Sequence, residues 1–247
     1  MKIPALVAHR GYTLHYPENT LVGIEAAIVA GARYVEVDVQ LTSDQVPVLY
    51  HDRTLERISN RQGSIHDYTA GQLGEFRALD FGRFGYKFAQ EPIATLTAFA
   101  ALLARYPKAT AFVEVKRIAV QRFGNSVVLS RMLRELRPVL RQCVLISYSL
   151  ETLLHARQQG WPAIGVVVDR WHDRNLALVR QINPEYLFCD SEGLPRFGKL
   201  RFANARLAVF EVTDAALALR LGRRGVELIE TYAIGELQTE LERLTAP

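Results

Sequence analysis

Short apolar runs rich in β-branched residues alternate along the chain with amphipathic stretches of helical length. This alternation predicts a parallel sheet with helices packed on its faces. Eight such runs favour closure into a single TIM-type (β/α)8 barrel over an open sheet. The predicted strands are residues 5–9, 34–39, 111–115, 143–147, 163–168, 186–189, 207–212 and 226–230.

Glycines mark the ends of three predicted helices, as they often do at helix termini. These are residues 20–30 before Gly31, residues 149–159 before Gly160 and residues 214–221 before Gly222. A doubly wound open sheet is the alternative fold, but no glycine-rich dinucleotide loop follows the first predicted strand. The chain has 247 residues, the length of one barrel, so we expect a single domain over residues 1–247.

One further strand-like run, residues 46–51, breaks the alternation. Only Ser43-Asp44-Gln45 separates it from the second strand, which is too short for a parallel crossover and predicts an antiparallel hairpin. With Asp44 and Gln45 as the two turn residues, His51 lies opposite Asp38. Residues from about 54 to 92 lack regular periodicity and contain several glycines and aromatic residues, which predicts a small insertion over the barrel mouth.

Composition narrows the classes of function. Hydrophobic residues make up 49% of the chain and charged residues 23%, as in ordinary globular proteins. The net charge of +4 comes from scattered basic residues, which predicts an anionic small-molecule partner and no nucleic-acid partner. No apolar stretch is long enough for membrane insertion and no leader is visible, so we expect a cytoplasmic protein. Cys143 and Cys189 lie in apolar runs and are expected to be buried free thiols. The composition does not indicate an oligomeric state.

The first predicted strand ends in His9-Arg10-Gly11. Active sites of β/α barrels lie at the carboxyl ends of the strands. A histidine followed by an arginine there offers a proton-transfer group beside an anion-binding group. The alternative for this tripeptide is a structural histidine at a strand end.

The second predicted strand carries two acids, Glu36 and Asp38, two residues apart. Side chains two apart in a strand share a face, and two carboxylates in an apolar strand repel each other and are costly to desolvate. A bound cation removes that cost, and oxygen ligands indicate Mg²⁺ or Ca²⁺. The alternative is a solvent-facing strand with two acids.

Glu114 and Lys116 share a face of the third parallel strand. Glu114 provides a third carboxylate and Lys116 a second cation for a phosphate. The alternative, a buried ion pair without function, seldom stabilises a protein. With His9 and His51, this set combines a metal site, an anion-binding site and an acid/base pair, which suits phosphoester hydrolysis.

The sequence resembles the glycerophosphodiester phosphodiesterase family in an ordered set of motifs. The resemblance covers effectively the whole chain and is far stronger in the N-terminal half. The motifs are His9-Arg10-Gly11, Pro17-Glu18-Asn19-Thr20, Glu36-Val37-Asp38, His51-Asp52, Thr54-Leu55-Glu56-Arg57, Leu79-Asp80-Phe81-Gly82, Ile93-Ala94-Thr95-Leu96 and Glu114-Val115-Lys116. The resemblance implies a barrel and metal-dependent hydrolysis of glycerophosphodiesters to glycerol 3-phosphate and an alcohol.

The resemblance also implies residue roles. His9 and His51 are the acid/base pair; Glu36, Asp38 and Glu114 hold Mg²⁺ or Ca²⁺; Arg10 and Lys116 bind the phosphate; Glu18 orients the first-strand residues, and Asn19 caps the first helix or lies near the substrate.

The C-terminal half departs from the family pattern. Phe210 stands where the family usually has a tryptophan, and can still pack against a glycerol face. Glu211 follows it, and Tyr232 replaces the aspartate of the closing run. Two alternatives therefore stay open: a lysophospholipase-D-like activity on longer-chain lysophospholipids, and a barrel that binds a phosphorylated ligand without turnover.

Overall fold

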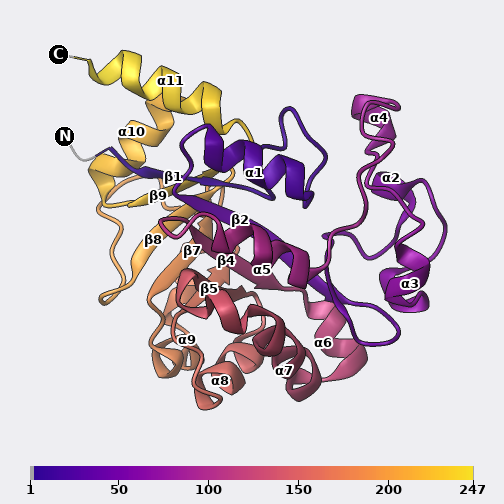
Figure 1. Ribbon diagram of the computed structural model, residues 1–247. Helices are drawn as coiled ribbons and strands as arrows, with labels where there is room; N and C mark the ends of the chain where they lie inside the picture. The colour runs from indigo at the N-terminus through magenta and orange to yellow at the C-terminus, as the bar shows by residue number, and fades with distance from the viewer. Residues whose placement is uncertain (1–2, 247) are drawn as a thin grey trace.

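The strands close into a barrel, seen in the centre of Figure 1. The structure is a computed structural model and describes residues 3–246. Within those residues, nine strands form one sheet in the order β1-β9-β8-β7-β6-β5-β4-β2-β3, and pairing of β1 with β2 closes it. All neighbours are parallel except β2 and β3. The TIM-type barrel is therefore confirmed and the open doubly wound sheet is excluded.

The strands are β1 (Ala5–Ala8), β2 (Tyr34–Leu41), β3 (Pro47–Leu49), β4 (Thr110–Val115), β5 (Cys143–Ser147), β6 (Ile164–Val168), β7 (Tyr186–Asp190), β8 (Arg206–Phe210) and β9 (Leu228–Thr231).

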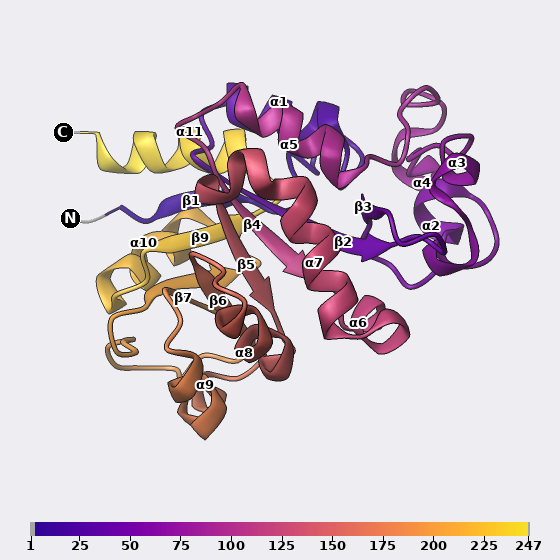
Figure 2. The same ribbon diagram turned by 60° about the horizontal axis from the view of Figure 1, so that its bottom comes forward.

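Helices surround the barrel (Figures 1 and 2). They are α1 (Leu21–Val29), α5 (Leu96–Ala104), α6 (Arg117–Phe123), α7 (Asn125–Leu136), α8 (Leu150–Gln158), α9 (Ala177–Ile182), α10 (Ala215–Arg224) and α11 (Ile234–Thr245), with the 3-10 segments η2 (Arg137–Gln142) and η3 (Trp171–Asn175). None of the helices between residues 3 and 246 has the length and apolar character that crossing a membrane requires.

Two helix predictions differ from the structure. α10 does not stop at Gly222 but continues to Arg224. Gly225 ends it, with a φ of 115° that favours glycine, and a Cβ at this position would lie 2.5 Å from the Leu200 carbonyl oxygen. At α1, Thr20 is the capping residue, because its side chain accepts a hydrogen bond from the Gly23 N–H. Of the two roles expected for Asn19, helix capping is therefore excluded, and a place near the substrate stays a prediction.

The period of two along the strands divides the core. One set of strand side chains packs outward against the helices. The other set fills the barrel interior with Val7, Phe112, Val144, Ile146, Val167, Phe188, Ala208 and Leu228. Cys143 and Cys189 are buried free thiols, as expected.

The predicted register of the hairpin is wrong by one residue. Val39 pairs with Leu49, so Tyr50 and not His51 lies opposite Asp38, and the Tyr50 N–H donates to the Asp38 carbonyl. The turn has three residues, because the Thr42 N–H bonds the Val46 carbonyl and Gln45 adopts a φ of 63°. His51 therefore lies beyond the end of β3 and reaches the site from a loop.

The predicted insertion after the second strand is present. Figures 1 and 2 place α2, α3 and α4 together to one side of the barrel, beyond the end of β2. Leu55, Ile58, Ile65 and Leu73 form a small apolar cluster of its own there, together with residues of the hairpin. The short elements are α2 (Glu56–Ser59), η1 (Ile65–Asp67), α3 (Ala70–Leu73) and α4 (Phe81–Phe84). Organisation of the chain as one domain stays a prediction.

Candidate active site

A polar cavity of about 150 Å³ lies inside the barrel at the carboxyl ends of the strands. Inward positions that are apolar deeper in the barrel, such as Val7 and Leu228, are followed two residues later by His9 and Glu230. The period of two therefore carries polar side chains to the mouth. The cavity is lined by His9, Arg10, Glu36, His51, Glu114, Lys116, Ile146, Tyr148, Val167, Phe188, Phe210, Glu211 and Glu230.

A tight turn after β1 aims the His9-Arg10 pair. Gly11 has a φ of 90°, and a Cβ on it would lie 2.8 Å from the Gly23 carbonyl carbon, so the loop rests directly on the backbone of α1. Arg10 has a φ of 54°, and its N–H donates to Glu36 Oε2 at 3.1 Å. The turn thereby joins the end of β1 to the acid of β2.

Asp38 lies beneath the cavity surface and binds two cations. Its Oδ2 is 3.0 Å from Arg10 Nε and its Oδ1 is 3.2 Å from Lys116 Nζ. The Asn19 side-chain amide donates to Oδ2 at 2.9 Å, and its oxygen accepts from the Asp38 N–H. Burial alone raises the pKa of this carboxyl, but Arg10 and Lys116 outweigh burial and hold the pKa well below its usual range. Asp38 is thus ionised and fixes both predicted phosphate-binding side chains.

Glu36 and Glu114 lie in a different electrostatic setting. Burial, with Asp38 and Glu230 nearby, raises the pKa of Glu36 well above its usual value. Burial also raises the pKa of Glu114, although Lys116 Nζ lies 3.0 Å from its Oε1. Carboxyls in this state need a further positive charge to ionise together.

The carboxylates of Glu36, Asp38 and Glu114 fit a divalent cation. One ligand oxygen from each lies within 4.8 Å of the others. Among the residues that the structure describes, Glu36 Oε1 has no hydrogen-bond partner although the side chain is 2% exposed. An unsatisfied buried carboxylate oxygen beside two other acids is the donor set of a hard cation.

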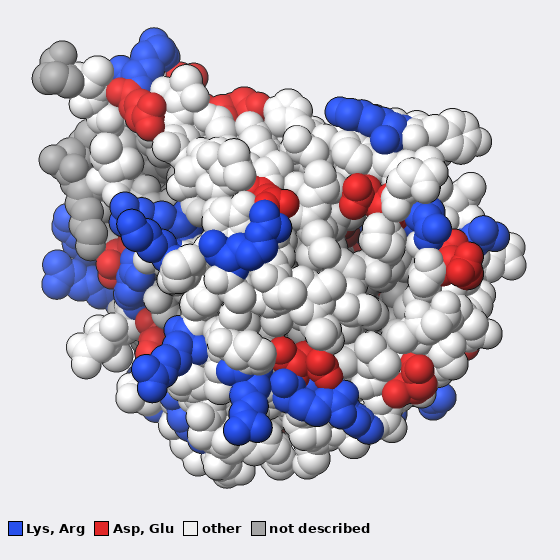
Figure 3. All heavy atoms as spheres, in the orientation of Figure 1, with Lys and Arg blue, Asp and Glu red and all other residues white. Residues whose placement is uncertain are grey.

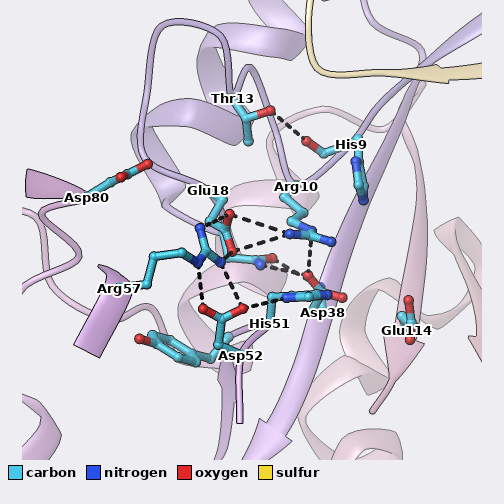
Figure 4. Close-up of polar contacts among 12 residues, drawn as sticks. His9, Arg10, Thr13, Glu18, Asp38, His51, Asp52, Arg57, Asp80 and Glu114 are labelled. Carbon is cyan, nitrogen blue, oxygen red and sulfur yellow. Dashed lines mark hydrogen bonds and ion pairs between the residues drawn. The ribbon is translucent and has the colours of Figure 1, made fainter. Parts of the chain in front are cut away.

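A chain of ion pairs links His51 to Arg10 (Figure 4). His51 Nδ1 lies 2.8 Å from Asp52 Oδ1, and Asp52 binds Arg57, with 2.6 Å between Oδ2 and Nε. Arg57 makes two bonds to Glu18, of 2.8 and 2.9 Å, and Glu18 lies 3.4 Å from Arg10 Nη1. Burial raises the pKa of Asp52, but hydrogen bonds from His51 and Arg57 outweigh it and hold that pKa below its usual range. An ionised Asp52 therefore holds the His51 ring through Nδ1.

His9 lies among acids. Its Nδ1 is 3.1 Å from Glu211 Oε1, and its Nε2 is 3.9 Å from Glu36 Oε2. Burial lowers the pKa of His9, but Glu230 and Glu211 outweigh burial and the pKa is raised overall. Glu211 thus orients this ring as Asp52 orients His51.

The structure brings together all the residues predicted for the site: His9, Arg10, Glu36, His51, Glu114, Lys116 and Phe210 line the cavity, and Glu18, Asn19 and Asp38 support it. Sequence reasoning missed Glu230, an inward acid of β9 whose pKa burial raises to about 7. Its signal was an acid inside an apolar strand, the pattern that singled out Glu36. The contacts of Asp52 and Arg57 were also missed, although both residues lie in the quoted motifs.

The fold and this site define a class: a (β/α)8 barrel with imidazole, guanidinium and carboxylate groups gathered at the carboxyl ends of its strands. Residues 9–186 match the model of the glycerophosphoryl diester phosphodiesterase family. The chain belongs to this family.

Individual relatives support the same placement. A glycerophosphodiester phosphodiesterase of Caldanaerobacter subterraneus subsp. tengcongensis is 45% identical over 37% of this chain and 37% of its own length. Human glycerophosphodiester phosphodiesterase 1 is 32% identical over 66% of this chain and 48% of its own length. The chain thus matches less than half of the length of either relative. An Oleispira antarctica phosphodiesterase, solved with the product sn-glycerol-3-phosphate, has the same fold, with a TM-score of 0.82, 22% identity and 97% of each chain covered.

Proposed function

We propose that this chain hydrolyses glycerophosphodiesters to glycerol 3-phosphate and an alcohol, with a divalent cation and two histidines. The observation that carries the proposal is the convergence of His9 and His51 on one cavity with the cations Arg10 and Lys116 and the acid Glu36. The names of the relatives and the product bound to the Oleispira antarctica protein support it.

Glu36, Asp38 and Glu114 would hold Mg²⁺ or Ca²⁺, because all three offer hard oxygen ligands. When bound, such an ion neutralises the charge of the phosphodiester and stabilises the charge that develops at phosphorus. Glu36, which has a buried oxygen without a hydrogen-bond partner, would gain one from such an ion.

Arg10 and Lys116 bind the phosphate. Both are fixed by Asp38, at 3.0 and 3.2 Å, so their charges are in place before substrate arrives. Arg10 is held from its other side by Glu18. Phe210, at the end of β8, offers an apolar face to the glycerol or the alcohol.

His9 and His51 move the protons. One imidazole removes a proton from the attacking oxygen, either of water or of a glycerol hydroxyl that first forms a cyclic phosphate, and the other donates a proton to the alcohol oxygen as its bond to phosphorus breaks. In both cases water supplies the new P–O bond of the glycerol 3-phosphate. Each ring is oriented by a carboxylate, His9 by Glu211 at 3.1 Å and His51 by Asp52 at 2.8 Å. An oriented pair on one cavity suits in-line displacement at phosphorus.

The test is release of glycerol 3-phosphate from glycerophosphocholine by the full chain, with and without a chelator. We expect His9→Ala and His51→Ala to lose about 10²–10⁴-fold in kcat. His172→Ala is the matched control, because this histidine is 71% exposed and does not line the cavity. Turnover that survives chelation, or a His9→Ala variant with full activity, contradicts the proposal.

The partner proposed is a small anionic diester. On the face shown in Figure 3, basic and acidic side chains are interspersed, which suits a small ligand better than a nucleic-acid backbone. A cytoplasmic location and the absence of membrane insertion stay predictions.

A further inference from the structure

Glu230 is a buried acid at the cavity that the proposed mechanism does not use. It lies in β9, paired with Val7 of β1, and is 4% exposed. Within residues 3–246, no group makes a hydrogen bond to its Oε1. The side chain nevertheless lines the cavity. A buried carboxylate oxygen without a partner costs free energy unless something binds it.

Glu36 faces Glu230 across β1. The strands β9 and β2 flank β1 in the closed barrel (Figure 1), and ligand atoms of Glu36, Glu230 and His9 all lie within 4.8 Å of one another. Glu36 Oε1 also lacks a partner among the described residues. Each of these two neighbouring carboxylates therefore has one oxygen without a partner.

The neighbouring cations are already engaged by other acids. Arg10 pairs with Asp38 and Glu18, and Lys116 pairs with Asp38 and Glu114. His9 lies 3.1 Å from Glu211 through Nδ1 and 3.9 Å from Glu36 through Nε2. A bound cation would supply the positive charge that Glu36 and Glu230 need in order to ionise together.

We propose that Glu230 is a further ligand of the divalent cation that Glu36 would hold, because Glu36 belongs both to the group with Glu230 and to the group with Asp38 and Glu114. The inference rests on the proposed function, because it extends the metal site proposed there. Carboxylate oxygens suit a hard cation. Ca²⁺ takes six to eight oxygen ligands, and Mg²⁺ usually keeps several waters. A divalent charge between two buried carboxylates removes their mutual repulsion.

The experiment measures binding of Ca²⁺ and of Mg²⁺ to the chelator-treated full chain by isothermal titration calorimetry. We expect Glu230→Gln to raise the dissociation constant at least about tenfold, because ligand charge sets the affinity of such sites. Glu230→Asp keeps the negative charge on a side chain that is shorter by one methylene. If Glu230 binds the ion directly, this variant should lose metal affinity as well. Glu211→Gln is the matched control, because it removes another acid of the same cavity, and its affinity is expected to stay near that of the wild type.

Each outcome decides one point. Equal affinity of wild type and Glu230→Gln overturns the role of Glu230. Loss in Glu230→Gln but wild-type affinity in Glu230→Asp shows an effect of charge at a distance and also overturns direct ligation. Absence of binding and of metal-dependent turnover in the wild type contradicts the proposed function itself.

Thermal unfolding separates a lost ligand from a damaged fold. Without metal, Glu230→Gln is expected to melt at or above the wild-type temperature, because it removes a buried charge. Added metal should then raise the melting temperature less than in the wild type. An equal rise in both proteins overturns the inference. If Glu230→Gln does not fold, Glu230→Asp decides the question by the same two measurements.

Discussion

Asp38 shows how one residue can hold a site together. Its carboxylate is 1% exposed, yet it is ionised because a guanidinium, an ammonium and an amide bind it. The same contacts fix Arg10 and Lys116 in the positions from which they reach the cavity. The residue therefore matters for stability and for phosphate binding at once.

Asp38→Asn is expected to destabilise the metal-free protein by about 3–5 kcal/mol, because it leaves two buried cations without their shared anion. Chemical unfolding with a chelator present measures this. Glu240→Gln is the control, since that acid is 50% exposed and an exposed pair contributes little. An Asp38→Asn variant as stable as the wild type would show that Arg10 and Lys116 find other partners.

Asp52 gives a pH dependence whose sign can be worked out. Its folded pKa is lowered, so below about pH 3.9, the ordinary value for Asp, the unfolded chain binds more protons than the native state. The stabilising contribution is therefore present above that pH and is lost as pH falls through the folded pKa. We expect the wild type to lose more stability than Asp52→Asn between pH 5 and pH 3, measured by urea unfolding. Parallel losses contradict the assignment.

The elements were predictable where periodicity alone decides them. The β/α alternation follows from residue pattern, whereas the cap of α1 is Thr20 and not Asn19. The hairpin register cannot be predicted from the pattern, because it depends on the left-handed conformation of Gln45, and glutamine gives no signal for that conformation. The end of α10 cannot be predicted from the pattern either, because Gly225 and not Gly222 lies against the Leu200 backbone.

The turn after β1 can be tested with two glycines. Gly11→Ala places a Cβ against the Gly23 backbone at a φ of 90°, and we expect a loss of about 1–3 kcal/mol in the free energy of unfolding. Activity should fall too, because His9 and Arg10 move with the turn. Gly82→Ala is the control: it lies in α4 with nothing within 4 Å of the new Cβ, and should be neutral or slightly stabilising. Equal effects of the two changes would count against the close approach.

At the scale of the whole molecule, the predictable part of the site is the part that lies on consecutive strands. His9, Glu36 and Glu114 follow from strand ends and the period of two. Glu230 carries the same signal of an acid in an apolar strand, but its place beside Glu36 follows only when that signal is combined with barrel closure, which brings the last strand next to the first. The contact of Arg57 with Glu18 depends on the way the segment 54–92 folds back onto the barrel, which no local pattern encodes.

That segment is expected to open more readily than the barrel. Its helices are short and its apolar cluster is small beside the core of the barrel, and low local burial gives low local stability. Amide hydrogen exchange should therefore be faster over residues 54–92 than in the barrel strands. Uniform exchange through both parts would mean that the molecule opens only as one unit.

Arg57 is one of the residues that connect this segment to the barrel: it binds Glu18, and it binds Asp52, which in turn contacts His51. His66 is another, through the Leu41 carbonyl. Arg57→Ala should speed exchange over residues 54–92 and leave the strand amides unchanged. It should also lower kcat, because Asp52 loses the partner that fixes it against His51. Arg53→Ala is the control, an exposed arginine four residues away. If both variants behave alike, the ion-pair chain does not couple the segment to the site; if only Arg57→Ala changes exchange and turnover together, the segment helps to position His51.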